Sequence, residues 1–236
     1  MSFDLPYTFA YDAPTSTRLS SYTGLKAAVS EWLGRDGDVD IGDRFDDLLA
    51  LHETRMYFGT SPQVALGLQA CEPLRIRDME VTDTAFALAA TVAQPVGFLE
   101  MIEASLNGPV RPVDVVTEAV FAAYGSGSLG GVKMMAVSGT NFRVKDTPDT
   151  GTTATLRYFK RQTTPTPAAG NVILTTYPNI YFHGCLHEAA AYIGDADSAK
   201  IYLSLYAAGV QSLNERRNRE LWASSNVRVR IRGRTP

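Results

Sequence analysis

The sequence predicts an α+β protein in which helices at both ends of the chain flank a β-rich middle segment. Three observations lead to this fold class. Apolar residues recur at helical spacing before residue 60 and after residue 170. Between these regions, short alternating segments and glycine turns predict strands over about 74–160. After the last helix, the chain alternates valine or isoleucine with arginine, which is typical of an extended arm. We expect the terminal helices to pack together as a helical bundle.

Two helices are predicted in the N-terminal part. Residues 1–20 contain prolines and aromatic residues without a helical period, so we expect an extended N-terminal arm. A helix over 22–33 begins after the cap pair Ser20-Ser21 and ends at Gly34. A second helix covers 41–59, and Ser61-Pro62 predicts the start of a short helix to about Ala70.

The middle segment contains most of the expected strands. Alternation predicts a strand over 74–81, and the Asn107-Gly108 pair predicts a hairpin turn. A short helix over 114–124 would be capped by Asp114. The remaining strands are expected at 85–88, 98–102, 133–138, 141–145 and 152–160.

Two long helices are expected next, over 171–193 with an interruption near Pro178 and over 195–222. The inner side of the second should carry Ile201, Leu205, Ala208 and Leu213. The resulting organisation is an arm at 1–20, one domain at 21–222 and a basic arm at 223–236.

Composition places the chain among ordinary globular proteins, with 45% hydrophobic and 20% charged residues. No apolar run reaches the roughly 18 residues that span a bilayer, and the first 20 residues lack the layout of a secretory signal. Two cysteines, Cys71 and Cys185, are too few for a disulfide framework, and we expect both to be buried.

Charge is distributed unevenly along the chain. Residues 215–236 carry a net charge of +5, and the other 214 residues carry −8. An extended arm with apolar residues on one side is unstable alone and becomes stable when it adds to a sheet edge. Its arginines would meet an acidic protein partner or nucleic acid, and a solvated tail is the third alternative. The predicted partner-binding residues are Trp222, Val227, Arg228, Val229, Arg230, Ile231, Arg232 and Arg234.

The motifs of cofactor chemistry have little support. Residues 125–130 match GxGxxG, but a predicted helix precedes them and a strand follows, which is the reverse of a dinucleotide site. A calcium loop starting at Asp36 would place Arg44 and Asp47 at two ligand positions, so a solvated acidic surface is the simpler interpretation. We therefore predict no cofactor.

One pair of histidines resembles a metal site. His183 and His187 stand at i, i+4 spacing and would share a helix face. Only His52 remains as a further histidine, and no CxxC or GxSxG motif occurs. Two packing histidines are the simpler interpretation, and the alternative is a small metal-dependent hydrolase. We predict no enzyme, no metal ligands and no catalytic residues.

Ordered blocks along the chain resemble the head-to-tail adaptor (connector) proteins of tailed bacteriophages. Residues 22–35 are similar to the family pattern YxxLxxxIxxWLxR, and residues 45–56 to FIxLAExRL. The most specific block is 171–192, NVILTTYPNIYFHGCLHEAAAY, which is similar to NWLLxxxPDLYLYGALLEAAPYL. Further blocks lie at 94–100, 111–120 and 156–159, so the resemblance covers about nine tenths of the chain.

This resemblance implies a structural virion protein at the head–tail junction, made in the host cytoplasm. It implies a dodecameric ring beneath the portal, with neighbouring copies, the portal protein and a tail or nozzle protein as partners. Genomic DNA would pass through the lumen without sequence-specific binding, and no membrane is involved. The C-terminal arm would reach onto the portal. The alternatives from the residues themselves are the hydrolase and a DNA-binding module that uses the arginine tail.

Overall fold

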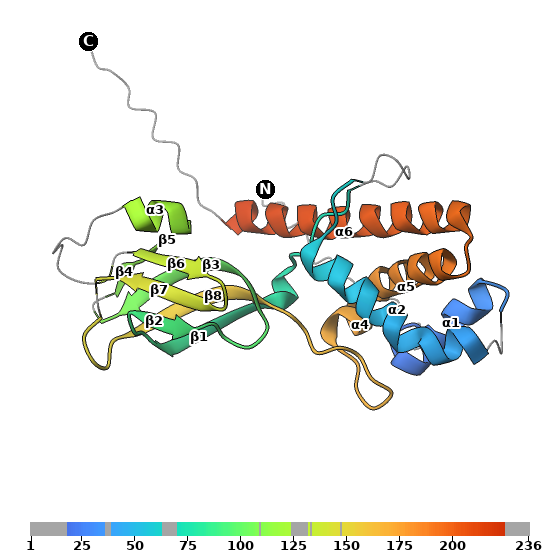
Figure 1. The fold of residues 1–236 in the computed structure, drawn as a ribbon, viewed down its shortest axis with the longest axis horizontal. Coiled ribbons are helices and arrows are strands. Elements are labelled where there is room, and N and C mark those ends of the chain that lie inside the picture. Colours follow the sequence, from blue (N-terminus) through green and yellow to red (C-terminus); the bar gives the residue numbers. More distant parts are fainter. Residues whose placement is uncertain are drawn as a thin grey trace, which may run out of the picture. The chain divides into compact units, whose positions relative to one another are not determined.

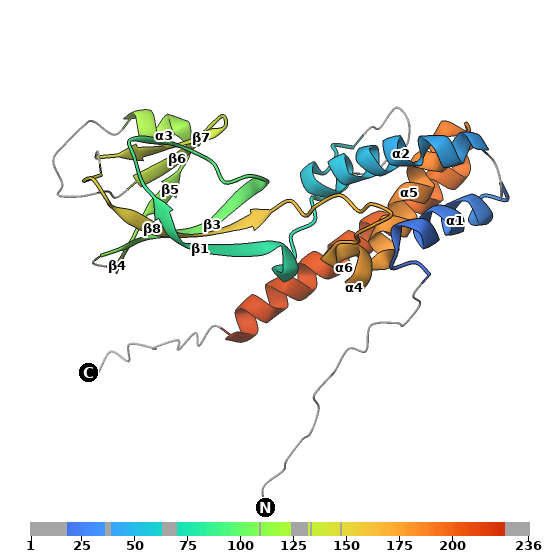
Figure 2. The same ribbon diagram turned by 90° about the horizontal axis from the view of Figure 1, so that it is seen from below.

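The computed structural model describes residues 18–35, 39–62, 70–108, 110–123, 132, 134–146 and 148–224. The chain forms two compact units (Figures 1 and 2). The first comprises the residues up to Pro73 together with Thr163–Gln211, and the second comprises Leu74–Gln162 and the residues from Ser212 onward. The described part contains six α-helices and two four-stranded sheets, which confirms the α+β fold class.

The first unit is helical. It contains α1 (Tyr22–Trp32), α2 (Val39–Phe58), α4 (Val172–Thr176), α5 (Pro178–Tyr192) and the first part of α6 (Ala196–Ser224). Helices α1, α2 and α4 all contact α5, which lies at the centre of the unit (Figure 2). This position explains why ten of the 15 residues of α5 are buried, including the polar His187 and Glu188.

The helix ends follow the sequence signals closely. The Ser21 hydroxyl accepts the Gly24 N–H at 3.2 Å, as expected of an N-cap, and Gly34 ends α1 with a φ of 67°. The predicted interruption at Pro178 is confirmed, because Pro178 opens α5 after α4 ends.

A buried carboxylate connects three segments of the helical unit. Glu53 on α2 is fully buried, and its two oxygens accept hydrogen bonds from Tyr181 Oη at 2.9 Å and Thr164 Oγ1 at 2.6 Å. Asn171 donates to Tyr181 Oη at 2.7 Å and also caps α4 through the Leu174 N–H. Each polar group of this network has a partner, so its burial costs little free energy.

The buried face of α6 differs from the prediction. Ile201 and Leu205 are 58% and 46% exposed and Ala208 is exposed, so this part of the prediction is wrong. The buried side chains are Ala199, Leu203, Tyr206 and Val210. Both sets have helical spacing, but they are offset by two residues, or about 200° around the axis. The periodicity alone therefore does not show which stripe faces the core.

The second unit is built from two sheets. One has the order β1-β8-β3-β4 and is fully antiparallel; the other has the order β2-β7-β6-β5, in which β5 and β6 are parallel (Figure 1). The bounds are β1 (Glu80–Ala87), β2 (Thr91–Ala93), β3 (Phe98–Asn107), β4 (Val110–Pro112), β5 (Asp114–Val116), β6 (Met134–Ser138), β7 (Asn141–Lys145) and β8 (Thr153–Lys160). A short helix, α3 (Glu118–Ala123), follows β5.

A shared apolar core joins the two sheets. Leu106 and Leu156 come from the first sheet, and Met135, Phe142 and Val144 from the second. Burial alternates along β7 and most of β8, as expected of strands with one buried face, whereas the adjacent Met135 and Ala136 of β6 are both buried. The strands expected at 133–138, 141–145 and 152–160 and the Asn107-Gly108 hairpin are confirmed.

Two local predictions in the middle segment fail, and one strand was missed. Residues 74–76 are irregular, a 3₁₀ turn occupies Arg77–Met79, and β1 begins only at Glu80. The helix expected over 114–124 begins only at Glu118, because Asp114–Val116 pairs with β6 and Thr117 caps α3 instead of Asp114. Strand β2 has only three residues and was not predicted. Residues 61–62 are not helical, and 63–69 lie outside the described residues.

Gly184 provides a test of packing in the helical unit. A Cβ at this position of α5 would lie 1.9 Å from His52 Nδ1, so we expect Gly184→Ala to destabilise the unit by about 1–3 kcal/mol. Gly42→Ala on α2 is the matched control, since its Cβ would meet only Lys26 Cε at 3.8 Å. There the better helix propensity of alanine should stabilise by roughly 0.5–1 kcal/mol. Urea denaturation measures both, and stabilisation by Gly184→Ala would contradict the packing.

Candidate partner-binding site

The residues that the sequence assigned to partner binding lie mostly in a segment that the structure does not describe. Val227, Arg228, Val229, Arg230, Ile231, Arg232 and Arg234 lie outside the described residues. Trp222 lies in α6, but only its backbone is described. The structure does describe the segment from which the arm departs: the end of α6 and the sheet residues of the second unit that contact it.

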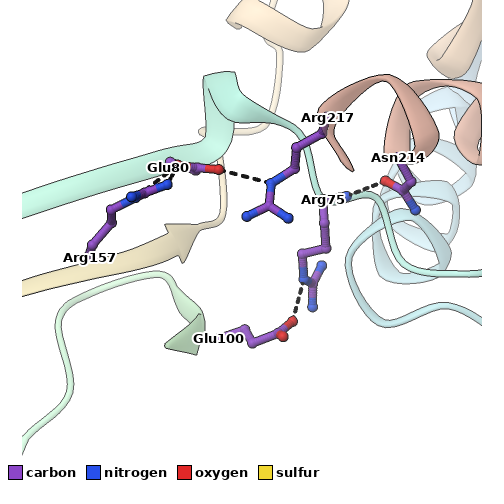
Figure 3. Close-up of polar contacts among 6 residues, drawn as sticks. All are labelled: Arg75, Glu80, Glu100, Arg157, Asn214 and Arg217. Atoms are coloured by element: carbon purple, nitrogen blue, oxygen red, sulfur yellow. Dashed lines mark hydrogen bonds and ion pairs between the residues drawn. The ribbon is translucent and has the colours of Figure 1, made fainter. Parts of the chain in front are cut away.

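Two side chains hold the end of α6 in place (Figure 3). The side-chain oxygen of Asn214 accepts the backbone N–H of Arg75 at 2.8 Å. One helical turn later, Arg217 donates from Nε to Glu80 Oε1 at 2.9 Å. Residue 75 is not part of a strand, so its N–H is not used in a sheet ladder. It donates to the Asn214 side chain instead.

Glu80 is the centre of this arrangement. Its Oε2 accepts hydrogen bonds from Arg157 Nε at 3.1 Å and Nη2 at 2.8 Å, while its Oε1 accepts from Arg217 (Figure 3). Glu80 begins β1, and Arg157 lies on the paired strand β8. The side chains of Glu80 and Arg217 are only 12% and 16% exposed, so solvent screens their attraction less than that of a surface pair.

An aromatic ring supports the same arginines. The Arg217 guanidinium carbon lies 4.6 Å from the centre of the Phe159 ring, and that of Arg75 lies 5.5 Å from it. Phe159 is buried, and the guanidinium groups of both arginines lie over its ring. Arg75 also donates to Glu100 Oε2 at 2.8 Å (Figure 3). We call Arg75, Glu80, Arg157, Phe159, Asn214 and Arg217 the α6 latch.

An open pocket of about 530 Å³ lies beside the latch. Its lining residues are Arg77, Glu80, Thr82, Arg157, Arg217, Glu220 and Leu221. Arginines do not exchange protons at neutral pH but bind carboxylates through fixed, planar donors. The arginines of this pocket are therefore suited to binding an acidic group.

A second pocket of about 390 Å³ lies in the same unit. Arg143 and Lys145 contact the ring of Phe121 there, and Arg143 is paired with Glu118. Its basic groups are thus already engaged with α3, so the pocket at the latch is the better candidate site.

The histidine pair does not form a metal centre with other described residues. His183 and His187 lie on α5 at the predicted spacing, and His187 Nδ1 is 2.8 Å from the Ala199 carbonyl oxygen. Burial lowers the pKa of both imidazoles. Within the described ranges, no group of three or more histidine, cysteine or acidic side chains could hold a metal ion. His187 is buried and packs in the core of the helical unit.

The other candidate chemistries fall on α2, on two cysteines and on the segment after α3. Asp40, Asp43, Asp46 and Asp47 lie on the exposed side of α2, whereas Asp36, at which the calcium loop would start, lies outside the described residues. Cys71 and Cys185 are buried and not joined by a disulfide, and burial raises the pKa of both thiols. The GxGxxG segment lies outside the described residues, but α3 precedes it and β6 follows, as predicted.

The latch was not predicted from the sequence. Glu80 and Arg157 both lie in segments with strand alternation, but they are 77 residues apart, and Glu80 and Arg217 are 137 residues apart. The only available signal was a set of charged residues within half-buried strands, which indicates a partner but does not identify it.

The chain matches the SU10 adaptor protein family over residues 20–230. No curated protein matches it. The match covers both units, so the chain belongs to this family of phage head-to-tail adaptors, as the resemblance predicted. The class is a structural protein of the virion, which implies a place at the head–tail junction and interactions with portal and tail proteins. Among the described residues, no helix is both long and apolar enough to cross a membrane.

The latch can be tested by removing the charge of Glu80. Glu80→Gln leaves two partly buried guanidiniums without their carboxylate, and we expect a loss of about 1–3 kcal/mol in the free energy of unfolding of the second unit. Glu100→Gln is the matched control, because Glu100 is 57% exposed and its pair with Arg75 should contribute less than about 1 kcal/mol. Urea denaturation compares the two without screening the ion pairs; equal losses would contradict a central role for Glu80.

The buried imidazole of His52 should make the stability of the helical unit depend on pH. Its ring is fully buried between Tyr181 and Tyr206, neither ring nitrogen has a hydrogen-bond partner among the described residues, and burial lowers its pKa to about 3. The unfolded chain takes up this proton near pH 6.5, so stability falls as the pH decreases below that value. At pH 5 the loss should reach roughly 2 kcal/mol from this group alone.

The measurement is urea denaturation of the helical unit at pH 8 and pH 5. His52→Leu should lose less stability between the two values than the unchanged protein. His183→Leu, at a half-buried position, should have a smaller effect on this difference. An equal pH dependence of the His52→Leu variant and the unchanged protein would show that His52 is not the group responsible.

Proposed function

We propose that the protein forms a ring beneath the portal and extends the channel through which DNA leaves the capsid. The family match over residues 20–230 supports this proposal more than any other observation, because it includes both the helical unit and the β-sheet unit. The adaptor's work is association rather than catalysis. A ring of identical copies needs two different surfaces on each copy, one for each neighbour. The resemblance implies that this ring is a dodecamer, and we propose that number of copies.

The charge distribution supports a channel role. Residues 1–214 carry a net charge of −8, which repels DNA phosphates. A lumen that repels phosphate would let the genome pass without trapping it. In this proposal the helices of 21–222 form the bundle of the ring body, and residues 1–20 form an arm that contacts a neighbour or a tail component.

The C-terminal arm, residues 223–236, would bind the portal. Val227, Val229 and Ile231 alternate with arginines, as in a strand that pairs with an exposed sheet edge. The latch supports this role, because it holds the last turns of α6 against a sheet and so fixes the point at which the arm begins. An arm with a fixed origin loses less entropy when it docks.

A truncation tests the arm. Removing residues 222–236 leaves the latch residues in place, so we expect unchanged helicity and unfolding but loss of portal binding. A full-length variant with Val227, Val229 and Ile231 changed to Ser keeps all the arginines and serves as the matched comparison. If strand addition matters, this variant should bind the portal at least roughly tenfold more weakly. Normal portal binding by the truncated protein would contradict the proposal.

Native mass spectrometry of the protein alone and with its portal ring tests the ring itself. A defined number of copies added to each portal supports the adaptor role, and the mass gives that number. No addition, with the arm intact, would contradict it. If the arginines instead serve a DNA-binding module, the protein should bind duplex DNA with an affinity that falls steeply with salt.

A further inference from the structure

The pocket beside the latch has more positive than negative charge. Arg77, Arg157 and Arg217 line it together with Glu80 and Glu220. Glu80 is already shared by Arg157 and Arg217, and Glu220 is paired with Arg216 at 3.0 Å. Arg77 is exposed, and its guanidinium has no ion-pair partner within the part of the chain that the structure describes. The pocket therefore has a cation available for an incoming carboxylate.

A surface with the opposite charge lies in the helical unit, on α2. Its exposed side carries Asp40, Asp43, Asp46 and Asp47 against a single basic residue, Arg44. The side chain of Asp47 is 74% exposed. Its Oδ2 lies 3.7 Å from Arg44 Nη1, which is longer than a hydrogen bond. Leu51, one turn further along α2, is 56% exposed. This side of α2 therefore offers carboxylates and an apolar side chain next to each other.

On both surfaces, a leucine follows a charged residue by four positions. On α6, Leu221 follows Arg217 by four residues, and both line the pocket. On α2, Leu51 follows Asp47 by four residues. Four residues correspond to about 6 Å along a helix, so an α2 from a second copy that lies beside α6 in the same direction can place Leu51 against Leu221 and Asp47 at the pocket that Arg77 also lines. Leu221 is itself 39% exposed.

We propose that the arginine pocket of one copy receives the acidic side of α2, around Asp47 and Leu51, from a second copy of the chain. This inference rests on the proposed ring and names the side chains that join neighbouring copies. Because the two surfaces differ, every copy keeps one of each available for the next copy, and such a contact continues around a ring until it closes. A DNA phosphate fits the pocket less well, because the exposed Leu221 would then have no apolar partner.

Charge reversal on each surface tests this contact without disturbing the latch. Arg77→Glu and Asp47→Arg each place like charges together, and either variant alone should assemble roughly tenfold more weakly. Lys200→Glu is the matched control, since it makes the same change of charge at another exposed helical position and should assemble normally. Assembly is measured by native mass spectrometry, both free and on the portal ring.

Mixing the two variants gives the decisive result. In an equimolar mixture, the glutamate introduced by Arg77→Glu meets the arginine that Asp47→Arg introduces in the other variant. At the next contact around the ring, an unchanged Arg77 meets an unchanged Asp47. We expect assembly to return, with the two variants alternating. A chain carrying both changes should also assemble. Recovery in the doubly changed chain but not in the mixture would show that the contact forms within one chain and would overturn the inference.

The remaining outcomes separate this inference from the proposed function. Rings that form normally with Arg77→Glu and Asp47→Arg would overturn the inference and leave the ring intact. Absence of any ring from the unchanged protein, free or on the portal, would overturn both. Loss of duplex DNA binding at moderate salt in Arg77→Glu, with rings unaffected, would overturn the inference and assign the pocket to DNA instead.

Discussion

The β-sheet unit depends on one shared carboxylate. Glu80 accepts hydrogen bonds from Arg157 on the neighbouring strand and from Arg217 on α6, and Phe159 lies beneath two arginines of the same group. The attraction between this carboxylate and two guanidiniums offsets the free energy that it costs to remove the carboxylate from water. The hydrogen bonds also fix the orientation of each arginine side chain. The end of α6 is thereby held on a sheet to which it is not adjacent in sequence. The proposed portal arm begins directly after that helix end.

The helical unit follows a different principle. Its buried polar groups are mostly satisfied, as Glu53 with Tyr181 and Thr164 illustrates, whereas both nitrogens of His52 lack hydrogen-bond partners among the described residues. Gly184 is the residue that leaves room for this imidazole. The unit thus combines a satisfied network, which fixes the packing of α2 against α5, with a buried imidazole that lowers stability in acid. Such a unit provides a stable body for assembly through its exposed side chains.

In the proposed assembly, exposed side chains would make the contacts between copies. Ile201, Leu205, Leu51 and Leu221 are exposed apolar residues on α2 and α6. The acidic side of α2 and the arginine pocket add opposite charges to this set. Charge pairs contribute specificity and orientation more than affinity, so the apolar residues would supply most of the association free energy.

The sequence by itself determined the α+β class, the helix ends at Ser21, Gly34 and Pro178, and the strands with clear alternation, because these depend on local backbone chemistry and side-chain period. It also determined the family through ordered blocks. Only the tertiary structure decided which stripe of α6 is buried, that Asp114–Val116 is a strand, and that Glu80, Arg157 and Arg217 meet. The two stripes of α6 have equal periodicity, and the latch joins residues up to 139 positions apart. Packing partners at such distances along the chain leave no local signal, so the fold alone brings them together.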